Sequence, residues 1–251
     1  MNVFISIISH NHSELIKRLN SIEGLCRCFN VIVKSNTDRD DLSNLLDNEN
    51  FSWVNEKYNK GFGENNNIVF SYCKNELNMK DDDFFIVLNP DVYIESSAIT
   101  KLVKKMESEK VKLATINLYK DFNKGIYDSS IRSFPTFKQF VYSFVGLGNT
   151  SIIDKANIYT SLKVNWAAGS FLAFTSEHYR KLKGFDEQYF MYCEDIDICY
   201  RSYSNGNELT YYPDVDAVHL AKHQNRKIFS MHFYWHVSSV FRFLFKKSLS
   251  R

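Results

Sequence analysis

Residues that interrupt regular structure are scarce in this chain. Its 251 residues include only three prolines and nine glycines, and no repeat or low-complexity segment is visible. Linkers and repeat arrays normally carry such signals, so nothing marks a boundary between separately folding units. Because 44% of the residues are hydrophobic, a chain of this length can bury one sizeable core, and we expect one main domain.

Long apolar runs and a strong charge excess are also missing. No run approaches the roughly 18 apolar residues that a membrane-spanning helix needs, and the short apolar start at residues 3–8 lacks the basic segment of a signal peptide. The formal net charge is only +2, which argues against nucleic acid as a partner. The five cysteines form no Cys-x-x-Cys pair, so we expect a reducing, cytoplasmic setting.

The most informative segment that is present is acidic and rich in aromatic residues. It contains Glu194, Asp195, Asp197 and Arg201. If a helix begins here, Glu194, Asp197 and Arg201 share one face, and Asp195 then points elsewhere, which suits a general base. The alternative is an ordinary helix start, because acidic first turns are favoured by the helix dipole and an ion pair at i,i+4 spacing is common.

A second acidic site follows residues 84–88, a run of five apolar residues that predicts a buried strand. Asn89 and Asp91 come directly after it, and ligands in open α/β sheets bind at the carboxyl ends of strands. Oxygen ligands of this kind suit Mg²⁺ or Mn²⁺ on a diphosphate. A turn in which both side chains only bond nearby backbone is the alternative.

Together the two sites resemble motifs of family 2 glycosyltransferases. Asn89-Pro90-Asp91-Val92 is similar to the family's divergent Asp-x-Asp motif, and Glu194-Asp195-x-Asp197-x-x-x-Arg201 is similar to its acceptor-side motif. The resemblance covers nearly all of the chain. It implies an α/β architecture, the GT-A fold, with a Rossmann-like, mixed and mostly parallel sheet flanked by helices.

Further segments extend the resemblance toward a donor site. Residues 3–9 predict the first strand, with Ser13 as N-cap of the next helix, and residues 29–34 predict the second. An Asp-Asn pair commonly follows that strand in the family; here Ser35 departs from it, Asn36 matches, and Asp38 is a candidate replacement.

Two small-residue loops complete this implied site. The segment 59–67 matches a family loop beside the nucleotide, whose glycines allow close backbone approach and whose asparagines bond the ligand or cap the next helix. The segment 166–171 resembles the loop under the donor sugar, although a buried strand end would look similar. The donor-binding residues implied are Ser9, Asn36, Gly61, Phe62, Gly63, Asn66, Asn89, Arg132, Gly169 and Ser170.

The resemblance also implies a mechanism. Asp91, assisted by His219, would bind a divalent cation, Mg²⁺ or Mn²⁺, that stabilises the leaving diphosphate; a loop histidine without ligand is the alternative for His219. Asp195, or else its neighbour Glu194, would take the proton of the acceptor hydroxyl in a single displacement with inversion. Asp197 and Arg201 would position the motif helix.

The last segment, residues 226–251, is amphipathic. Aromatic and aliphatic residues recur at helical spacing with basic residues at the ends, a pattern of interfacial membrane helices and also of helices packed on a core. We expect a domain at 1–225, with a nucleotide-sugar half at 1–110 and an acceptor half at 111–225, followed by this helix. Its expected membrane contacts are Phe233, Trp235, Phe241, Lys246 and Lys247.

Within the family, the motifs are most similar to those of bacterial rhamnosyltransferases of O-antigen assembly. This implies transfer from dTDP-β-L-rhamnose to the 3-hydroxyl of N-acetylglucosamine-diphospho-undecaprenol, at the cytoplasmic face of the inner membrane. One alternative is the same fold with another donor, such as a UDP-hexose. The other is a non-catalytic partner in a polysaccharide assembly complex. A sugar-1-phosphate nucleotidyltransferase is disfavoured, since residues 9–13 lack a glycine-rich loop with arginine and lysine.

Overall fold

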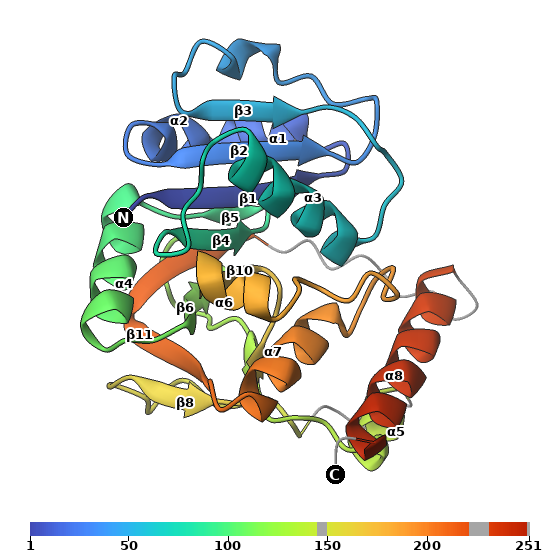
Figure 1. Ribbon diagram of the computed structural model, residues 1–251. Coiled ribbons are helices and arrows are strands. Elements are labelled where there is room, and N and C mark those ends of the chain that lie inside the picture. Colours follow the sequence, from blue (N-terminus) through green and yellow to red (C-terminus); the bar gives the residue numbers. More distant parts are fainter. Residues whose placement is uncertain (145–149, 221–230, 250–251) are drawn as a thin grey trace.

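A large mixed sheet with helices on both faces forms the body of the molecule (Figure 1). The computed structural model describes residues 1–144, 150–220 and 231–249. The sheet consists of β1 (Val3–Ser9), β2 (Asn30–Ser35), β3 (Phe51–Val54), β4 (Phe84–Leu88), β5 (Val92–Tyr93), β6 (Leu113–Tyr119), β8 (Leu162–Val164), β10 (Phe171–Thr175) and β11 (Leu209–His219). Their order is β3-β2-β1-β4-β10-β6-β11-β5, with β8 paired to β11.

The remaining elements are helices and one small second sheet. The helices are α1 (Ser13–Leu19), α2 (Ser21–Cys26), α3 (Phe62–Asn75), α4 (Ser96–Ser108), α5 (Phe137–Phe144), α6 (Ser176–Lys181), α7 (Glu194–Ser204) and α8 (Met231–Leu249), with a 3-10 turn, η1, at Ser43–Leu45. Strands β7 (Ile131–Arg132) and β9 (Trp166–Ala167) pair with each other outside the main sheet.

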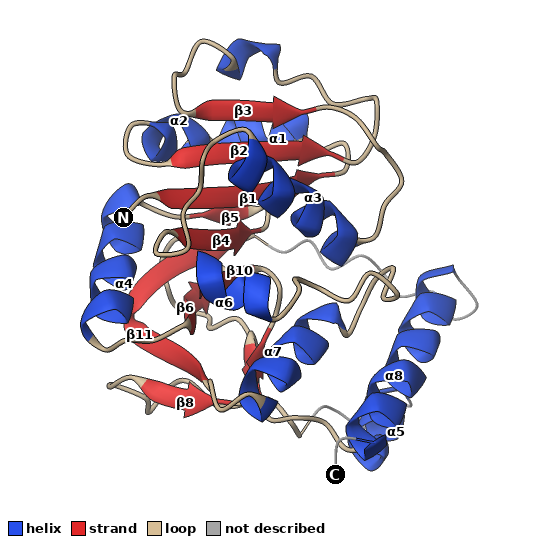
Figure 2. Ribbon diagram, in the orientation of Figure 1, coloured by secondary structure: helices blue, strands red, loops and turns tan. Residues whose placement is uncertain are grey.

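The alternation of side chains along buried strands creates a core on each face of the sheet. In β4, Phe84, Ile86 and Leu88 join one hydrophobic cluster, whereas Phe85 and Val87 join the other. Helices α1, α2 and α4 cover the first cluster and α3, α6 and α7 the second (Figure 2). Burial on both faces explains why these strands are continuous apolar runs.

Strand direction brings the motifs to one edge of the sheet. Strands β3, β2, β1 and β4 are parallel. Ser9 and Ser35, which end β1 and β2, and Asn89, which follows β4, therefore lie at the same edge of the sheet. Strand β10 is antiparallel to β4, with Phe171 opposite Leu88, and therefore begins where β4 ends. His219, the last residue of β11, is registered with Val92 of β5. The expected sheet flanked by helices is thus confirmed, and its geometry gathers the candidate residues.

One local prediction is wrong. Ser13 is not the N-cap of α1 but its first helical residue, and the N-cap is His12, whose side chain makes no capping hydrogen bond. The reason is a long-range substitute: the backbone N–H of Ser13 donates to Oδ1 of Asp40 at 3.2 Å. A helix N–H can be satisfied by any acceptor that the fold brings near.

The boundaries expected at residues 110 and 226 can be compared with the observed elements. The division near residue 110 falls between α4 and β6, in the middle of a continuous sheet. The expected start of the last helix at 226 lies outside the described residues, which resume at Met231 with α8. Within the described residues, no helix combines the length and apolar character needed to span a bilayer.

Candidate active site

Asp91 and His219 lie together at the edge where β4 and β11 end. Asp91 sits in the turn after β4, and its carbonyl oxygen accepts from the N–H of Leu220 at 3.0 Å. Nε2 of His219 is 3.3 Å from Oδ1 of Asp91, within ion-pair distance. The two residues that the sequence proposed as metal ligands are therefore neighbours, 128 positions apart in the chain.

A third residue, Asp128, belongs to this cluster and was missed by sequence reasoning. Its Oδ2 lies 2.7 Å from Nδ1 of His219. Asp128 follows β6 in an irregular segment, held by its own N–H donating to the carbonyl of Leu118 at 2.8 Å. No periodicity or motif in the sequence marks it, since its role depends on a contact across 91 positions.

The charges around His219 favour its protonated form. Burial alone would lower the pKa of His219, but the hydrogen bond to Asp128 and the charges of Asp91 and Asp128 raise it to about 9. Behind Asp128, the buried Nζ of Lys155 donates to Oγ of Ser130 at 2.8 Å. Burial lowers the pKa of Lys155 to about 8, against the effect of Asp128.

The ligand atoms of Asp91 and His219 suit a divalent cation that is also coordinated by oxygens of the substrate. Oδ1 of Asp91 is buried and, within the described residues, makes no polar contact beyond the ion pair with His219, so it can bind a cation once His219 is neutral. Across residues 1–144, 150–220 and 231–249, no group of three or more His, Cys, Asp or Glu is placed to hold a metal ion. Asp91 and His219 would thus need substrate oxygens to complete the coordination.

Asp195 and Glu194 begin α7, directly after a strained turn. Tyr192 and Cys193 both have left-handed backbones, with φ of 71° and 63°. Non-glycine residues adopt this conformation only where their surroundings impose it, and such strain is concentrated at functional sites. Here the turn directs two consecutive carboxyl groups into the interior at the start of the helix.

The two carboxyl groups have different partners. Oδ2 of Asp195 accepts from the N–H of Gly169 at 3.1 Å, and its Oδ1 accepts from the N–H of Ile196 at 2.8 Å. Glu194 is only 7% exposed, and its Oε2 has no hydrogen-bond partner within the described part of the chain. Asp195 is thus the carboxyl group whose charged form is stabilised by backbone donors.

Burial controls the ionisation of this pair. It raises the pKa of Glu194, and the negative charge of Asp195 raises it further. Burial also raises the pKa of Asp195, while the N–H groups of Gly169 and Ile196 and the charge of Arg132 oppose the shift. The pair therefore favours a protonated Glu194 beside an ionised Asp195.

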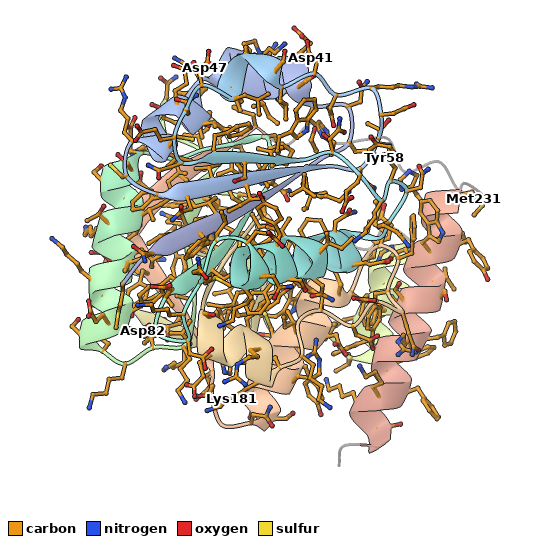
Figure 3. The ribbon with its side chains drawn as sticks, turned by 45° about the horizontal axis from the view of Figure 1, so that its top comes forward. Asp41, Asp47, Tyr58, Asp82, Lys181 and Met231 are labelled. Atoms are coloured by element: carbon orange, nitrogen blue, oxygen red, sulfur yellow. The ribbon has the colours of Figure 1, made fainter. Side chains whose placement is uncertain are left out.

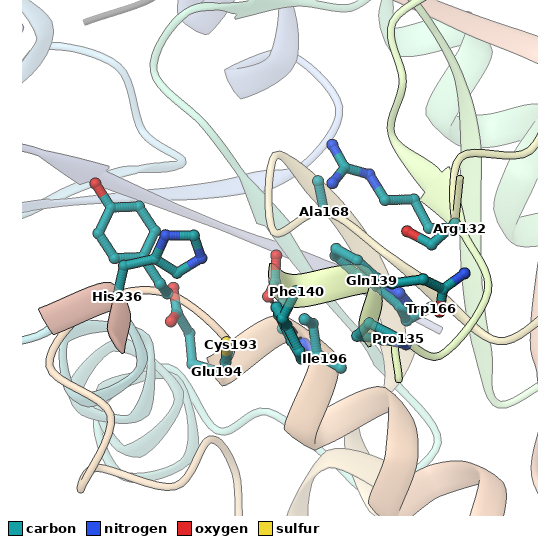
Figure 4. Close-up of a pocket in the computed structure, with 13 residues that line it drawn as sticks. Arg132, Pro135, Gln139, Phe140, Trp166, Ala168, Cys193, Glu194, Ile196 and His236 are labelled. Atoms are coloured by element: carbon teal, nitrogen blue, oxygen red, sulfur yellow. Dashed lines mark hydrogen bonds between the residues drawn. The ribbon is translucent and has the colours of Figure 1, made fainter. Parts of the chain in front are cut away.

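A pocket opens in front of these carboxyl groups (Figure 4). Arg132 and His236 lie on opposite sides of it, and Trp166, Phe140 and Pro135 supply an apolar wall. The guanidinium of Arg132 lies 5.2 Å from the ring centre of Trp166, and its Nε donates to the carbonyl of Ser129. Arg132, expected at the donor diphosphate, therefore faces the pocket of Asp195.

The small-residue loop before β10 connects the two carboxylate clusters. Its Gly169 donates to Asp195, while the carbonyl of Ser170 accepts from the N–H of Asn89 at 3.0 Å. A Cβ at Gly169 would lie 3.0 Å from the ring of Phe62. The buried Oγ of Ser170 has no hydrogen-bond partner in the described residues. Backbone hydrogen bonds from this loop thus link the segment of Asp91 to that of Asp195.

Gly61, directly before α3, and Gly63, in its first turn, are both close-packed against other parts of the chain. A Cβ at Gly61 would lie 2.6 Å from the carbonyl oxygen of Phe190, and one at Gly63 would lie 2.6 Å from Cβ of Phe185. The N–H of Phe62 donates to the same Phe190 carbonyl. The close approach is therefore made by the chain's own acceptor-side segment.

Two asparagines of the donor prediction are engaged inside the protein. Asn66 is fully buried; its Oδ1 accepts from Oγ of Ser6 at 2.7 Å, and its Nδ2 donates to the carbonyl of Phe62. Asn36 bonds both backbone groups of Lys60, at 2.8 and 2.9 Å. These contacts position the glycine loop, and direct contact of Asn36 or Asn66 with a donor stays a prediction.

An open pocket of about 560 Å³ lies after β1 and β2, on the side where the sequence predicts the nucleotide. Its lining includes Asp38, Arg39 and Tyr58, while Ser9 is fully buried behind it and accepts from the N–H of His12. Tyr58, labelled in Figure 3, lies on the connection between β3 and α3. Asp38, the candidate replacement for the absent acidic residue at position 35, thus faces the pocket.

Asp197 and Arg201 anchor the motif helix. Arg201 pairs with Asp197 at 2.7 Å and also donates to the carbonyls of Leu182 and Gly184. Asp197, only 2% exposed, receives a further ion pair from Lys246 of α8 at 2.6 Å. The positioning role expected for both residues stays a prediction.

Helix α8 packs on the domain with one side and leaves an apolar strip on the other. Val240 and Phe243 are buried, whereas Tyr234, Phe241 and Phe245 are exposed. Of the expected membrane residues, Phe233 and Phe241 are exposed, and Trp235 packs against Phe190 with ring centres 4.5 Å apart. Lys246 points inward to Asp186 and Asp197, and Lys247 donates to the carbonyl of Pro135.

Comparisons with known proteins agree with this arrangement. Residues 5–167, more than half of the chain, match the model of Glycosyl transferase family 2. The rhamnosyltransferase WbbL of Escherichia coli K12 is 37% identical over 252 residues, which cover 98% of this chain and 94% of that protein. The N-acetylglucosaminyl-diphospho-decaprenol L-rhamnosyltransferase of Mycobacterium tuberculosis is 26% identical over 169 residues, 65% of this chain and 55% of that one.

A solved structure supports the fold. Residues 1–349 of S. aureus TarS, in complex with UDP-GlcNAc, superpose with a TM-score of 0.63 at 14% identity, covering 93% of this chain and 64% of TarS. With the family model and the near-full-length relative, this likeness establishes the class of protein. The chain belongs to glycosyltransferase family 2, has a GT-A-like fold and is a glycosyltransferase.

Proposed function

We propose that this enzyme transfers L-rhamnose from dTDP-β-L-rhamnose to the 3-hydroxyl of N-acetylglucosamine-diphospho-undecaprenol in O-antigen synthesis. The observation that carries the proposal is the 37% identity to rhamnosyltransferase WbbL over nearly the whole of both chains. The mycobacterial relative supports the acceptor, because its name specifies an N-acetylglucosaminyl-diphospho-lipid and L-rhamnose.

The donor side would bind the nucleotide diphosphate at the edge of the sheet. Asp38, Arg39 and Tyr58 line the pocket for the nucleoside, and Asp91 and His219 would hold a Mg²⁺ or Mn²⁺ ion. Such an ion supplies stabilisation of the negative charge that develops on the leaving diphosphate. Asp128 accepts from Nδ1 of His219, so the neutral ring would offer its Nε2 lone pair to the cation. Cation binding would therefore displace the proton that Nε2 otherwise shares with Asp91.

Asp195 would act as the general base. Its ionised form is stabilised by two backbone N–H groups, whereas Glu194 is buried with a raised pKa and stays protonated. The acceptor oxygen forms its bond to the anomeric carbon as the bond to the diphosphate oxygen breaks. The hydroxyl proton passes to Asp195, and dTDP leaves with the electron pair. A single displacement of this kind inverts the anomeric configuration.

The acceptor's lipid would be reached at the cytoplasmic membrane surface. The strip of Tyr234, Phe241 and Phe245 on α8 is exposed, and aromatic residues of this kind partition into the headgroup region of a bilayer. Because Lys246 is engaged in ion pairs with the domain, apolar burial carries the interaction more than lysine contacts with anionic lipid. The enzyme would thus be a peripheral membrane protein.

Donor choice is tested by measuring sugar transfer from dTDP-rhamnose, UDP-glucose, UDP-galactose and GDP-mannose to a synthetic N-acetylglucosamine diphosphate with a short isoprenoid tail. Wild type should use dTDP-rhamnose alone, and Asp195→Asn should lose at least about 100-fold in kcat. Asp214→Asn, which disrupts only ion pairs with Lys101 and Lys105, is the control. Transfer from another donor would refute the rhamnose assignment while keeping the family and mechanism.

A further inference from the structure

The pocket in front of Asp195 has a wall that the proposed mechanism does not use. Helix α8 contributes His236 to a lining that otherwise comes from the segment 132–140, from Ser151, from residues 166–168 and from residues 192–196. His236 is half-buried, and the ring of Tyr192 packs against it with centres 4.9 Å apart. A side chain 41 positions away in the sequence thus shares a pocket with the catalytic carboxyl pair.

Helix α8 is held in this place by polar contacts to the segment that carries the carboxyl pair. Arg242 and Lys246 both bind Asp186, at 2.8 and 2.9 Å, and Lys246 also binds Asp197. Oγ of Ser239 donates to the carbonyl of Met191 at 2.9 Å. These contacts lie on both sides of the 190–195 turn, so the position of His236 relative to Asp195 is set by the fold.

The chemistry of the pocket suits a sugar ring. Pro135, Phe140 and Trp166 form an apolar wall, against which the C–H face of a sugar and the methyl of an acetamido group can pack. Arg132 and His236 add polar groups on opposite sides. The buried Oε2 of Glu194, which has no hydrogen-bond partner within residues 1–144, 150–220 and 231–249, is a further polar atom available to a ligand.

We propose that His236 is an acceptor-binding residue, which hydrogen-bonds the acceptor sugar from the α8 side of the pocket while Asp195 takes the proton of the attacking hydroxyl. An imidazole ring can both donate to and accept from sugar hydroxyls. The proposal rests on the proposed glycosyl transfer and adds to it that α8 is part of the acceptor site. The pocket proposed for the nucleoside is lined by the loops after β1 and β2 and by the connection to α3, and His236 does not line it.

The test distinguishes an effect on acceptor binding from an effect on donor binding. Steady-state kinetics with dTDP-rhamnose and the synthetic N-acetylglucosamine diphosphate should show an acceptor KM raised about tenfold in His236→Ala, as for a lost hydrogen bond of ordinary strength. Donor KM and the slow hydrolysis of dTDP-rhamnose without acceptor should stay within about twofold of wild type, which a general structural defect would not allow. His236→Gln, which keeps a donor and an acceptor, should recover most of the affinity.

Ser238→Ala is the control, because it changes an exposed position of α8 two residues from His236 that does not line the pocket. Its acceptor KM should stay near that of wild type. An unchanged acceptor KM in His236→Ala, or an equal loss of donor hydrolysis, would overturn the role of His236.

A binding measurement distinguishes this proposal from the donor assignment. Saturation-transfer NMR with the acceptor alone should show binding to wild type and weaker binding to His236→Ala. Binding without rhamnose transfer would refute the donor and leave His236 supported. Binding that is equal in both proteins would refute His236, and absence of binding to wild type would refute the acceptor class and His236 with it.

Discussion

At the scale of single residues, the two adjacent carboxyl groups of the site have different environments. Asp195 and Glu194 are adjacent, yet one accepts two backbone hydrogen bonds and the other is buried with Oε2 unpaired in the described structure. Charge stabilisation and desolvation therefore act on different members of the pair. This difference, which residue identity does not reveal, is what favours Asp195 as the base.

Glu194→Gln should stabilise the protein at alkaline pH. Burial raises the pKa of Glu194 in the folded state, so the folded protein keeps a proton that the unfolded chain loses above about pH 4.3. Wild-type stability should therefore fall as the pH rises from about 4.3 toward the folded-state pKa of about 8, whereas the Gln side chain stays neutral. We expect the Tm of the variant to exceed that of wild type by at least about 2 °C at pH 8, with a smaller gain at pH 5.

Thermal unfolding of both proteins at the two pH values measures this effect. Glu177→Gln is the control, because the hydrogen bond from Lys181 lowers the pKa of Glu177 and its removal should give no gain at pH 8. A Tm difference for Glu194→Gln that is independent of pH would contradict the raised pKa.

Asp128→Ala should weaken cation binding. The carboxylate accepts from Nδ1 of His219 and fixes the orientation of the ring, and loss of such a partner typically costs about 10- to 100-fold in metal affinity. Titration of Mn²⁺ followed by electron paramagnetic resonance measures the affinity without any turnover. Asp216→Asn, three residues from His219 and paired with Lys124 at the surface, should bind Mn²⁺ like wild type. Equal affinity in the Asp128 variant would exclude the orienting role.

At the scale of elements, the active site depends on two loops that touch. The glycine loop before α3 packs against the segment 185–190, which leads into the turn before α7. The helix that carries Asp195 is therefore positioned by the glycines as well as by the ion pair between its Asp197 and Arg201. Glycine in this loop was expected from the sequence; its partner was not, because a short backbone contact leaves no periodic signal.

Gly61→Ala should lower both stability and activity. Its Cβ would lie 2.6 Å from the carbonyl oxygen of Phe190, so one of the two loops must move, and we expect a cost on the order of 1–3 kcal/mol. Gly24→Ala, in α2, meets nothing within 4 Å and should be neutral or stabilising by about 0.5–1 kcal/mol. Urea unfolding of both variants measures the two effects. Equal stabilities would show that the loops are not in close contact.

At the scale of the whole molecule, α8 joins the acceptor pocket to the exposed surface. Its inner side contributes Val240 and Phe243 to the core and His236 to the pocket, while Phe241 and Phe245 are 60% and 65% exposed. A lipid-linked acceptor has a polar head, which would enter the pocket on the inner side of α8, and an apolar tail, which would lie along its exposed outer side. Deleting the helix would uncover core residues, so substitutions on its outer strip are the better probe of membrane contact.

Replacing both Phe241 and Phe245 by Ser should reduce binding to vesicles while leaving folding intact. Burial of exposed aromatic side chains drives interfacial binding, so we expect about a tenfold or greater loss of partitioning. Co-sedimentation with phosphatidylglycerol-containing vesicles measures it. Phe122→Ser, which removes a 57% exposed phenylalanine on the β6–β7 connection, should bind as wild type does. Undiminished binding by the double variant would refute the interfacial role of α8.

The sequence by itself determined the central strands, the family and the residues proposed for its chemistry. Apolar runs were sufficient for β1 and β4, whose predicted bounds the structure reproduces, and local motifs identified Asp91, His219, Glu194 and Asp195. These features are legible because strand burial and helix starts depend on neighbouring residues.

Only the tertiary structure decided which residues complete each site. Asp128 binds His219 across 91 positions, and His236 of α8 lines the same pocket as the carboxyl pair. Asp40 serves the start of α1, and Gly61 accommodates Phe190. The physical reason is common to all four contacts: each joins groups that are distant along the chain, so their meeting depends on how strands and helices pack and leaves no local pattern.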